Sequence, residues 1–305
     1  MIIPTRNRPE LLGRAVQLLL NQTLARSRYE LIIVDSASTA ATPALLARLA
    51  AEHSHIKTLR AEKPGVSLAR NLGLNAAQAP LLLLLDDDIL VEKTFLADVL
   101  AGAAAHPGRV LLGKINAPWD ESTDPFQRFL IQARDVNIYD FPDPSNVPPN
   151  YFYTACVAIP REALGAARFD ENFPCYGLED IEFGIRLLQG RPGMVYLPAL
   201  SVRHEYFPRY RDYRIKKRKL GCSLAYFLQK NPENARYFYV EPTGQRCFYR
   251  LYRLLAWPAA ALAYGYERLA RRKGPLNSLL YHWFYRDLRV QLYNGMRQYN
   301  RGAEK

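Results

Sequence analysis

The segment LLLLLDDDIL, residues 81–90, constrains the fold and the chemistry of this 305-residue chain more than any other. Five leucines of strand length end in three consecutive aspartates, Asp86, Asp87 and Asp88. Aspartate is depleted in strands, and carboxylates near a buried strand are costly unless a cation or a donor pairs with them. Folding alone gives little reason for this cluster, so the sequence predicts a cation at the end of a buried strand.

The first 200 residues alternate short apolar runs with helical patterns, which is typical of an α/β fold with a mostly parallel sheet flanked by helices. Residues 117–150, rich in Pro, Asp and Asn, predict a long surface excursion. We expect strands at 1–4, 30–35, 56–61, 80–86, 109–116, 151–159, 193–198 and 200–206, and helices at about 9–19, 42–53, 67–76, 95–105 and 178–190.

Polar side chains follow three of these predicted strands. Thr5, Asp35 and Asp86 each stand at a carboxyl end, where ligands of parallel α/β sheets bind. Alternate residues of an extended segment point the same way, so Asp86 and Asp88 can converge on one site. Such a pair suits Mg²⁺ or Mn²⁺ bound to a diphosphate. The alternatives are a turn or cap role for Asp35 and a solvated acidic turn at 86–88.

A second acidic cluster, Glu179, Asp180 and Glu182, opens the predicted helix at 178–190. Acids in a first turn are favoured by the helix dipole, but one of them could also act as a general base. His204 follows the last predicted strand and is either structural or a further ligand of the divalent ion. Arg70 lies on a helix after a glycine-containing loop and could contact a base or a phosphate.

The last third of the chain differs in charge from the rest. Residues 1–200 hold 19 Lys/Arg and 22 Asp/Glu, whereas residues 201–305 hold 22 and 7, so the whole excess of +12 belongs to the end. That end also holds 21 of the 36 aromatic residues in helical patterns. Interfacial helices on an anionic membrane fit best, ahead of packing on the first part and of nucleic-acid binding.

Other whole-chain features restrict the setting. The four cysteines lack CxxC spacing, which argues against a zinc site or a disulfide scaffold and indicates a reducing, cytosolic environment. Met1 leads directly into an apolar strand, so no signal peptide is expected. The run at 254–266 is too short to span a bilayer as one helix.

Six segments in this order resemble glycosyltransferase family 2, which has the GT-A fold. They are IIPTRNRPELL, IIVDSAST, PGVSLARNLGL, LLLLLDDDI, GLEDIEFGIRL and VRH, and they extend over about residues 1–205. The resemblance implies a nucleotide-sugar donor, a divalent metal ion and inversion at the anomeric carbon. Residues 1–207 would then be a GT-A catalytic domain, and 208–305 a helical, basic and aromatic region at a membrane interface.

The resemblance also implies roles for individual residues. Asp180 matches the base of the family's ED motif, with Glu179 orienting the acceptor or the base. Asp88 and His204 match metal ligands. The positions around the nucleotide sugar are Thr5, Asn7, Asp35, Arg70, Asp86 and Asp87. The family often has VDDGS after its second strand, whereas this chain has VDSAS, which puts donor contacts at Ser36 and Ala37 in question.

These features predict a metal-dependent inverting glycosyltransferase, with a UDP-sugar favoured as donor. We expect the acceptor to be a glycan or a lipid-linked sugar of the cell surface, and the enzyme to act at the cytoplasmic face of the membrane. Two alternatives remain: a non-catalytic glycan- or nucleotide-binding protein of the same fold, and a sugar-phosphate nucleotidyltransferase. The second would need a glycine-rich phosphate loop after the first strand, and PTRNRPELL has none.

Overall fold

The computed structural model describes residues 1–39, 41–116, 124–133, 139–205, 209–238, 240, 242–271 and 275–303. The chain forms two compact units. The sheet unit comprises Met1–Ala117, Tyr139–Asn172 and Glu179–Tyr206, and the helical unit comprises Pro118–Ile138, Phe173–Leu178 and Phe207–Lys305. Within the described part of the chain, no helix combines the length and the apolar content that crossing a bilayer requires.

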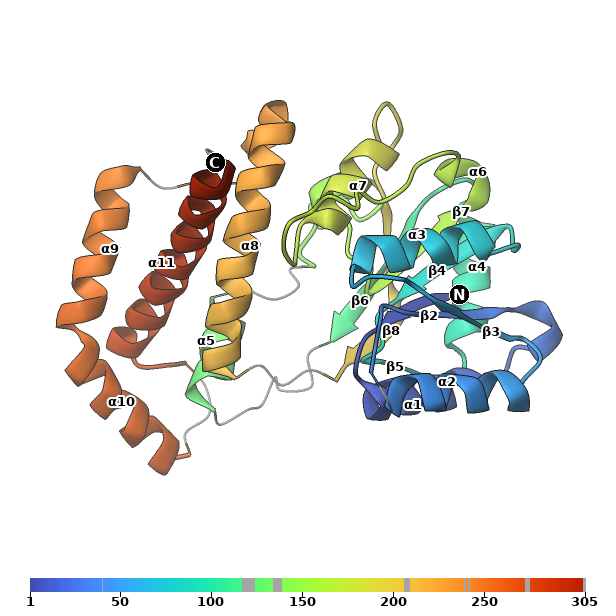
Figure 1. The fold of residues 1–305 in the computed structure, drawn as a ribbon, viewed down its shortest axis with the longest axis horizontal. Helices are drawn as coiled ribbons and strands as arrows, with labels where there is room; N and C mark the ends of the chain where they lie inside the picture. The colour runs from blue at the N-terminus through green and yellow to red at the C-terminus, as the bar shows by residue number, and fades with distance from the viewer. Residues whose placement is uncertain are drawn as a thin grey trace. The chain divides into compact units, whose positions relative to one another are not determined.

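The sheet unit is built on one eight-stranded sheet of order β3-β2-β1-β4-β7-β6-β8-β5 (Figure 1). The strands from β3 to β4 pair in parallel, β7 pairs antiparallel with β4 and β6, and β8 runs parallel to β6 and antiparallel to β5. The predicted α/β fold is confirmed. The bounds are β1 Ile2–Thr5, β2 Leu31–Asp35, β3 Ile56–Arg60, β4 Leu81–Leu85, β5 Ile89–Val91, β6 Leu111–Asn116, β7 Cys156–Pro160 and β8 Val195–His204.

Helices cover both faces of this sheet because its central strands are apolar on both sides. In β1, Ile3 packs with one set of helices and Ile2 with the other, and both side chains are fully buried. The first set is α1 (Pro9–Leu20), α2 (Ala41–Glu52) and α4 (Phe95–Ala105). The second set is α3 (Val66–Ala76), α6 (Arg161–Leu164) and α7 (Glu179–Leu187).

Three local features differ from the sequence-based expectations. A helix, α5 (Pro125–Gln132), occupies part of the expected surface excursion, and Asp124 caps it by accepting from two backbone amides. The two strands expected at 193–206 are one strand, β8, whose register shifts opposite Gly113 and Lys114. The short strand β5 directly follows the aspartates and pairs with the end of β8. The last feature brings His204 next to Asp88.

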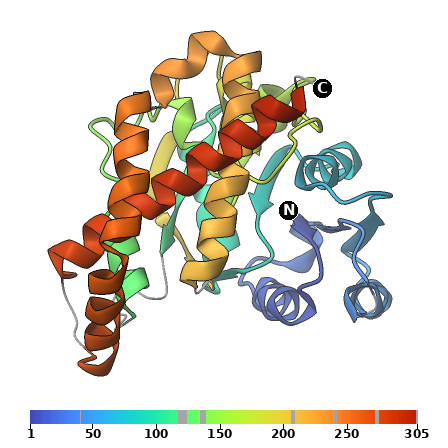
Figure 2. The ribbon, with the colours of Figure 1, turned by 60° about the vertical axis from the view of Figure 1, so that its left-hand side comes forward.

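The helical unit contains α5 together with α8 (Tyr210–Lys230), α9 (Thr243–Leu255), α10 (Trp257–Leu269) and α11 (Ser278–Ala303). The 26-residue α11 crosses the unit between α8 and α9 (Figure 2). Gly221 of α8 and Gly295 of α11 permit the close approach, since a Cβ at either would overlap a backbone carbonyl of the other helix. Short 3₁₀ turns lie at Arg26–Arg28, Pro149–Tyr151 and Pro232–Tyr237.

Candidate active site

The register of the sheet places the predicted polar residues at one edge. Thr5 is opposite Asp35, and Asp35 is opposite Arg60, so three neighbouring parallel strands end together. Asp86 follows β4, the next strand in the sheet. Parallel strands of equal register put their carboxyl ends side by side, which is why residues far apart in sequence share this edge.

Asp87 faces the first loop of the chain. It accepts hydrogen bonds from Thr5 Oγ1 at 2.7 Å and from Arg8 at 3.1 Å, and it is buried. Burial raises the pKa of Asp87 to about 6, against the lowering effect of Arg8 and Thr5. Arg8, which the sequence analysis did not single out, also contacts Asp88 at 2.9 Å. The first loop therefore supplies a cation that two of the three aspartates share.

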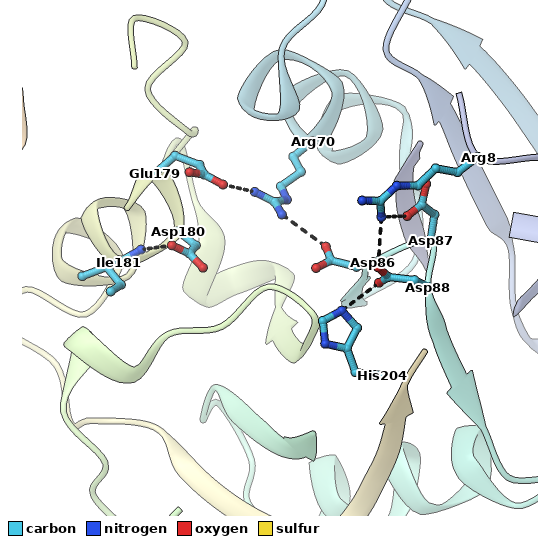
Figure 3. A network of polar contacts seen from close by, with 9 residues as sticks. All are labelled: Arg8, Arg70, Asp86, Asp87, Asp88, Glu179, Asp180, Ile181 and His204. Carbon is cyan, nitrogen blue, oxygen red and sulfur yellow. Dashed lines mark hydrogen bonds and ion pairs between the residues drawn. The ribbon is translucent and has the colours of Figure 1, made fainter. Parts of the chain in front are cut away.

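Asp88 faces His204. The pairing of Ile89 with His204 in β5 and β8 sets Nε2 of His204 3.1 Å from Oδ1 of Asp88 (Figure 3). Burial acts to raise the pKa of Asp88, but His204 and Arg8 together hold it below its ordinary value. An ionised carboxylate and an imidazole, one at the end of each paired strand, thus converge on one point.

This pair fits a divalent ion. Oδ1 of Asp88 is a buried oxygen, and among the described residues no hydrogen-bond donor besides the His204 imidazole, 3.1 Å away, approaches it. Mg²⁺ and Mn²⁺ take one or two protein ligands when phosphate oxygens and waters complete the shell. Among the described residues no group of three His, Cys, Asp or Glu side chains gathers into an all-protein metal cage. The donor set therefore suits an ion that arrives with a phosphate ligand.

Arg70 joins the two acidic clusters. Its guanidinium donates to Asp86 at 3.3 Å and to Glu179 at 3.0 Å, and it lies 5.4 Å from the centre of the Phe169 ring. The side chains of Arg70 and Glu179 are only 5% and 6% exposed, so their pair is held away from bulk water, whereas Asp86 is 33% exposed. A helix arginine that sequence analysis assigned to the nucleotide is thus also the bridge between the end of β4 and the start of α7.

Asp180 stands beside this bridge. In Figure 3 the carboxylates of Asp180 and Asp86 face one another across the space next to Arg70. Oδ1 of Asp180 accepts from the Ile181 amide at 2.9 Å. Burial, followed by the charge of Glu179, raises the pKa of Asp180 to about 7, and Arg70 offsets part of this. The third acid, Glu182, is turned away and pairs with Arg186 at 2.7 Å.

Asp35 and Asn7 belong to a second group of contacts in the loops after β1 and β2. Asp35 is buried, accepts from the Ser38 amide at 2.9 Å, and pairs with Arg60. The backbone amide of Asn7 donates to Ser38 Oγ at 2.9 Å, and the side-chain Oδ1 of Asn7 accepts from the backbone amide of Thr39 at 2.8 Å. These bonds hold the two loops against each other.

The unusual VDSAS segment keeps a turn that glycine would adopt easily. Ala37 has φ 53°, in the left-handed region. Ser36 Oγ accepts from the Gly65 amide at 2.9 Å, which ties this turn to the loop before α3. The serine thus has a structural role in the place where the family often has an acid.

The predicted residues therefore fall into two sets. Ion pairs and hydrogen bonds link the first set into two groups that meet at the consecutive residues Asp86 and Asp87. Arg8 joins Asp87, which Thr5 contacts, to Asp88, which His204 contacts. Arg70 joins Asp86 to Glu179, and Asp180 is next to Glu179. Asn7 and Asp35 form the second set with Ser38 and Arg60. Arg8 and Arg60 were missed. Register could have indicated Arg60, since it ends β3 beside Asp35, but no sequence signal marks Arg8.

Comparison with known proteins gives a consistent result. The family described as "Glycosyl transferase family 2" matches residues 1–157, just over half of the chain. Validoxylamine A glucosyltransferase of Streptomyces hygroscopicus subsp. jinggangensis (strain 5008) is 29% identical over 261 residues, or 76% of this chain and 60% of that protein. Poly(ribitol-phosphate) beta-N-acetylglucosaminyltransferase TarP of Staphylococcus aureus (strain N315) is 30% identical over 115 residues, or 37% of this chain and 35% of that protein. The chain thus spans less than two thirds of the length of these relatives.

A solved structure shows the same fold. The mannosyltransferase PcManGT from Pyrobaculum calidifontis, solved in complex with GDP-Man and Mn²⁺, superposes with a TM-score of 0.61 at 18% identity. The match covers 98% of this chain and 86% of that protein. At this identity the likeness shows the fold alone, and that fold is GT-A, as the sequence predicted.

Proposed function

The chain belongs to glycosyl transferase family 2, and we propose that it moves a sugar, with inversion, from a nucleotide-sugar donor to a hydroxyl of a glycan or lipid-linked acceptor at the inner face of the cell membrane. One observation carries the proposal. Arg70 contacts both Asp86 at the donor edge and Glu179 beside Asp180, so one buried side chain fixes the two acidic clusters relative to each other. A single displacement needs this fixed relation between leaving group and base.

The donor would lie along the carboxyl ends of β1, β2 and β4. Thr5, Asn7 and Asp35 surround the position proposed for the nucleoside, and Asp86 and Asp87 face its ribose side. The arginines Arg8 and Arg60 add cations for phosphate or base oxygens, since both side chains remain about half exposed. We propose a UDP-sugar as the donor, and GDP-Man, with which the mannosyltransferase of the same fold is solved, is the competing nucleotide sugar.

Asp88 and His204 would hold Mg²⁺ or Mn²⁺. When bound, such an ion neutralises the charge that develops on the departing diphosphate. Arg8 would support metal binding because its guanidinium, 2.9 Å from Asp88, orients that carboxylate and, together with His204, lowers its pKa. The protein therefore provides one oxygen ligand, one nitrogen ligand and an adjacent positive charge.

Asp180 would act as the general base. It takes the proton from the acceptor hydroxyl while that oxygen bonds to the anomeric carbon and the bond to the diphosphate breaks on the opposite face. A pKa near 7 makes the ionised carboxylate a stronger base than an ordinary aspartate while leaving it available at neutral pH. Glu179 is held by Arg70 and would orient the acceptor or the base.

The relatives and the composition of the chain's end both bear on the acceptor. The relative TarP is named for transfer to poly(ribitol-phosphate), and the relative from Streptomyces for transfer to validoxylamine A. The basic, aromatic end of this chain supports a membrane-bound acceptor over a small soluble one. Comparing lipid-linked and water-soluble acceptors in a transfer assay separates the two.

Calorimetry tests the donor site. Purified protein is titrated with UDP, GDP and dTDP, each with and without Mn²⁺, and the titrations are repeated on Asp88→Asn. We expect one nucleotide to bind with Mn²⁺ and to lose that metal dependence in the variant. Asp143→Asn, which changes an exposed aspartate outside the network, serves as the matched control. No binding of any nucleotide by the folded protein would favour the non-catalytic alternative.

A further inference from the structure

The helix α9 has its polarity reversed. Its arginines point into the helical unit: Arg250 donates to Asn294 at 3.4 Å, Arg253 contacts Asp287 at 3.2 Å, and Arg246 lies 4.6 Å from the centre of the Tyr293 ring. Its leucines point out to solvent, and Leu251, Leu254 and Leu255 are between 56% and 73% exposed. An ordinary surface helix has the opposite arrangement.

The helix α10 continues this surface. Trp257, Leu262 and Leu269 are 59% to 89% exposed, while Ala260 and Glu267 are buried. Among the described residues, eight of the ten large hydrophobic side chains that are strongly exposed belong to α9 and α10. Figure 1 shows α9 beside α11 and α10 continuing from the end of α9. We call the set Leu251, Leu254, Leu255, Trp257, Leu262 and Leu269 the α9–α10 apolar face.

Buried ion pairs fix the orientation of both helices. Arg253 is bound to Asp287 of α11, which is 1% exposed, and Glu267 of α10 is bound to Arg128 of α5 at 2.8 Å. Rotating either helix to bury its leucines would break these pairs and leave charges unpaired in the interior. The apolar face is therefore a property of the folded unit, and its exposure costs solvation free energy unless something covers it.

Charge indicates what covers it. The described residues of 242–271 carry five arginines and one carboxylate, Glu267, which is buried and paired. Arg268 and Arg271 are exposed at the end of α10. Across a two-fold axis a second copy of the chain would offer these arginines the same stretch, whose only carboxylate among the described residues is buried and already paired. A surface of anionic lipid offers apolar chains below and phosphates above, which matches leucines and tryptophan bordered by arginines.

We infer that the α9–α10 apolar face is a docking surface for an anionic lipid membrane. The leucines enter the boundary between headgroups and acyl chains, and Arg268 and Arg271 contact lipid phosphates. This deepens the proposed function, because it assigns to particular helices the membrane partner proposed there. It requires no catalysis, so it is tested separately from sugar transfer.

Vesicle flotation gives the first test. The full chain is mixed with vesicles of equal parts phosphatidylglycerol and phosphatidylcholine, or of phosphatidylcholine alone. We expect binding to the anionic vesicles, weakened by salt, and a loss of about tenfold or more in partitioning for Leu251→Gln with Leu255→Gln. The control Ile215→Gln changes a similarly exposed apolar residue on α8 and is expected to bind as the parent does. Circular dichroism verifies that each variant is folded.

Tryptophan quenching gives a second test that leaves the leucines unchanged. Lipids with brominated acyl chains quench only nearby indoles, so we expect anionic vesicles of such lipids to quench the parent protein. In a Trp119→Phe background, which removes the third indole of the chain, Trp257→Phe should remove that quenching. Trp283→Phe should retain it, because the Trp283 indole is directed inward and donates to the Arg253 carbonyl at 3.2 Å.

Three results would overturn the inference. The first is equal binding of the parent and the double leucine variant to anionic vesicles. The second is unchanged quenching in Trp257→Phe. The third is a stable dimer in sedimentation without lipid that the leucine substitutions dissociate, which would assign the face to a second copy. Donor hydrolysis measured on the parent protein keeps the questions apart: hydrolysis without binding to anionic vesicles overturns only the docking surface, and vesicle binding without hydrolysis overturns only the enzyme.

Discussion

Both units of the molecule bury carboxylates, but they pair them differently. In the helical unit, the carboxylate of Asp287 forms ion pairs with Arg214 at 2.7 Å and with Arg253 at 3.2 Å. It also accepts a hydrogen bond from the Tyr210 hydroxyl at 2.5 Å. In the sheet unit, five carboxylates gather around two arginines and one histidine. They are Asp86, Asp87, Asp88, Glu179 and Asp180.

Burial and the excess of negative charge raise the pKa of two acids in the sheet unit. Burial raises the pKa of Asp87 to about 6 and that of Asp180 to about 7, and neighbouring carboxylates add to both shifts. Cations balance the buried charge at Asp287, as expected of a group that stabilises a fold. Carboxylates that outnumber the cations around them are instead typical of sites that bind a cation or exchange a proton. The comparison thus sets Asp287, which cations balance, apart from the carboxylates that we propose to bind the metal ion or to exchange a proton.

The substitution Asp180→Asn removes the carboxylate that we propose as the general base. We expect transfer to fall by roughly 10³-fold, within the range for loss of a general base, while nucleotide affinity changes little. Removing one repelled charge should leave the thermal midpoint unchanged or higher. Steady-state kinetics, calorimetry and thermal unfolding measure the three quantities. Equal losses of binding and turnover would exclude Asp180 as the base.

The substitution Glu267→Gln removes a buried carboxylate that stabilises the helical unit. It removes the buried carboxylate that pairs with Arg128 at 2.8 Å, so we expect the free energy of unfolding to fall by about 3–5 kcal/mol. Urea denaturation measures this. The matched control is Lys57→Gln, which opens the more exposed Lys57–Glu30 pair and should cost about 1 kcal/mol or less. Similar losses in the two variants would contradict the distinction drawn here.

The pH dependence of the reaction reports on the protonation of Asp180. If Asp180 is the base, kcat/KM should rise about tenfold per pH unit below pH 7 and level off above it. The raised pKa also means that the folded state binds the proton more tightly than the unfolded state. The corresponding stability is present at low pH and is lost as pH rises from about 4 through 7. Asp180→Asn should therefore gain stability relative to the parent at pH 8 compared with pH 5.

Much of the fold and of the donor edge followed from sequence because local patterns encode them. The buried strand before Asp86 and the helix that carries Arg70 have clear periodicity, and parallel register then aligns Thr5 with Asp35. The family and the GT-A fold were predicted correctly. The assignments of individual site residues remain predictions that the experiments above address.

The remaining features depend on tertiary pairing. Arg8 reaches Asp87 and Asp88 across about 80 residues of sequence, and no local pattern announces such a contact. The partnership of Asp88 with His204 required β5, a three-residue strand too short to recognise from periodicity. The inward arginines of α9 were equally hidden, because composition gives the basic and apolar residues of a helix but does not say which side faces the bundle.

The smallest expected effect concerns Ala37, in the loop that follows β2. Ala37 has φ 53°, which costs about 1–2 kcal/mol for a residue with a Cβ, while glycine loses about 0.5–1 kcal/mol more backbone entropy on folding. We therefore expect Ala37→Gly to stabilise the protein by up to about 1 kcal/mol without changing nucleotide affinity. The control Ala47→Gly, on the exposed side of α2, should destabilise by about 1 kcal/mol. Opposite signs in urea denaturation would show that strain lies at the loop, whereas a loss in both variants would show that the Ala37 turn carries none.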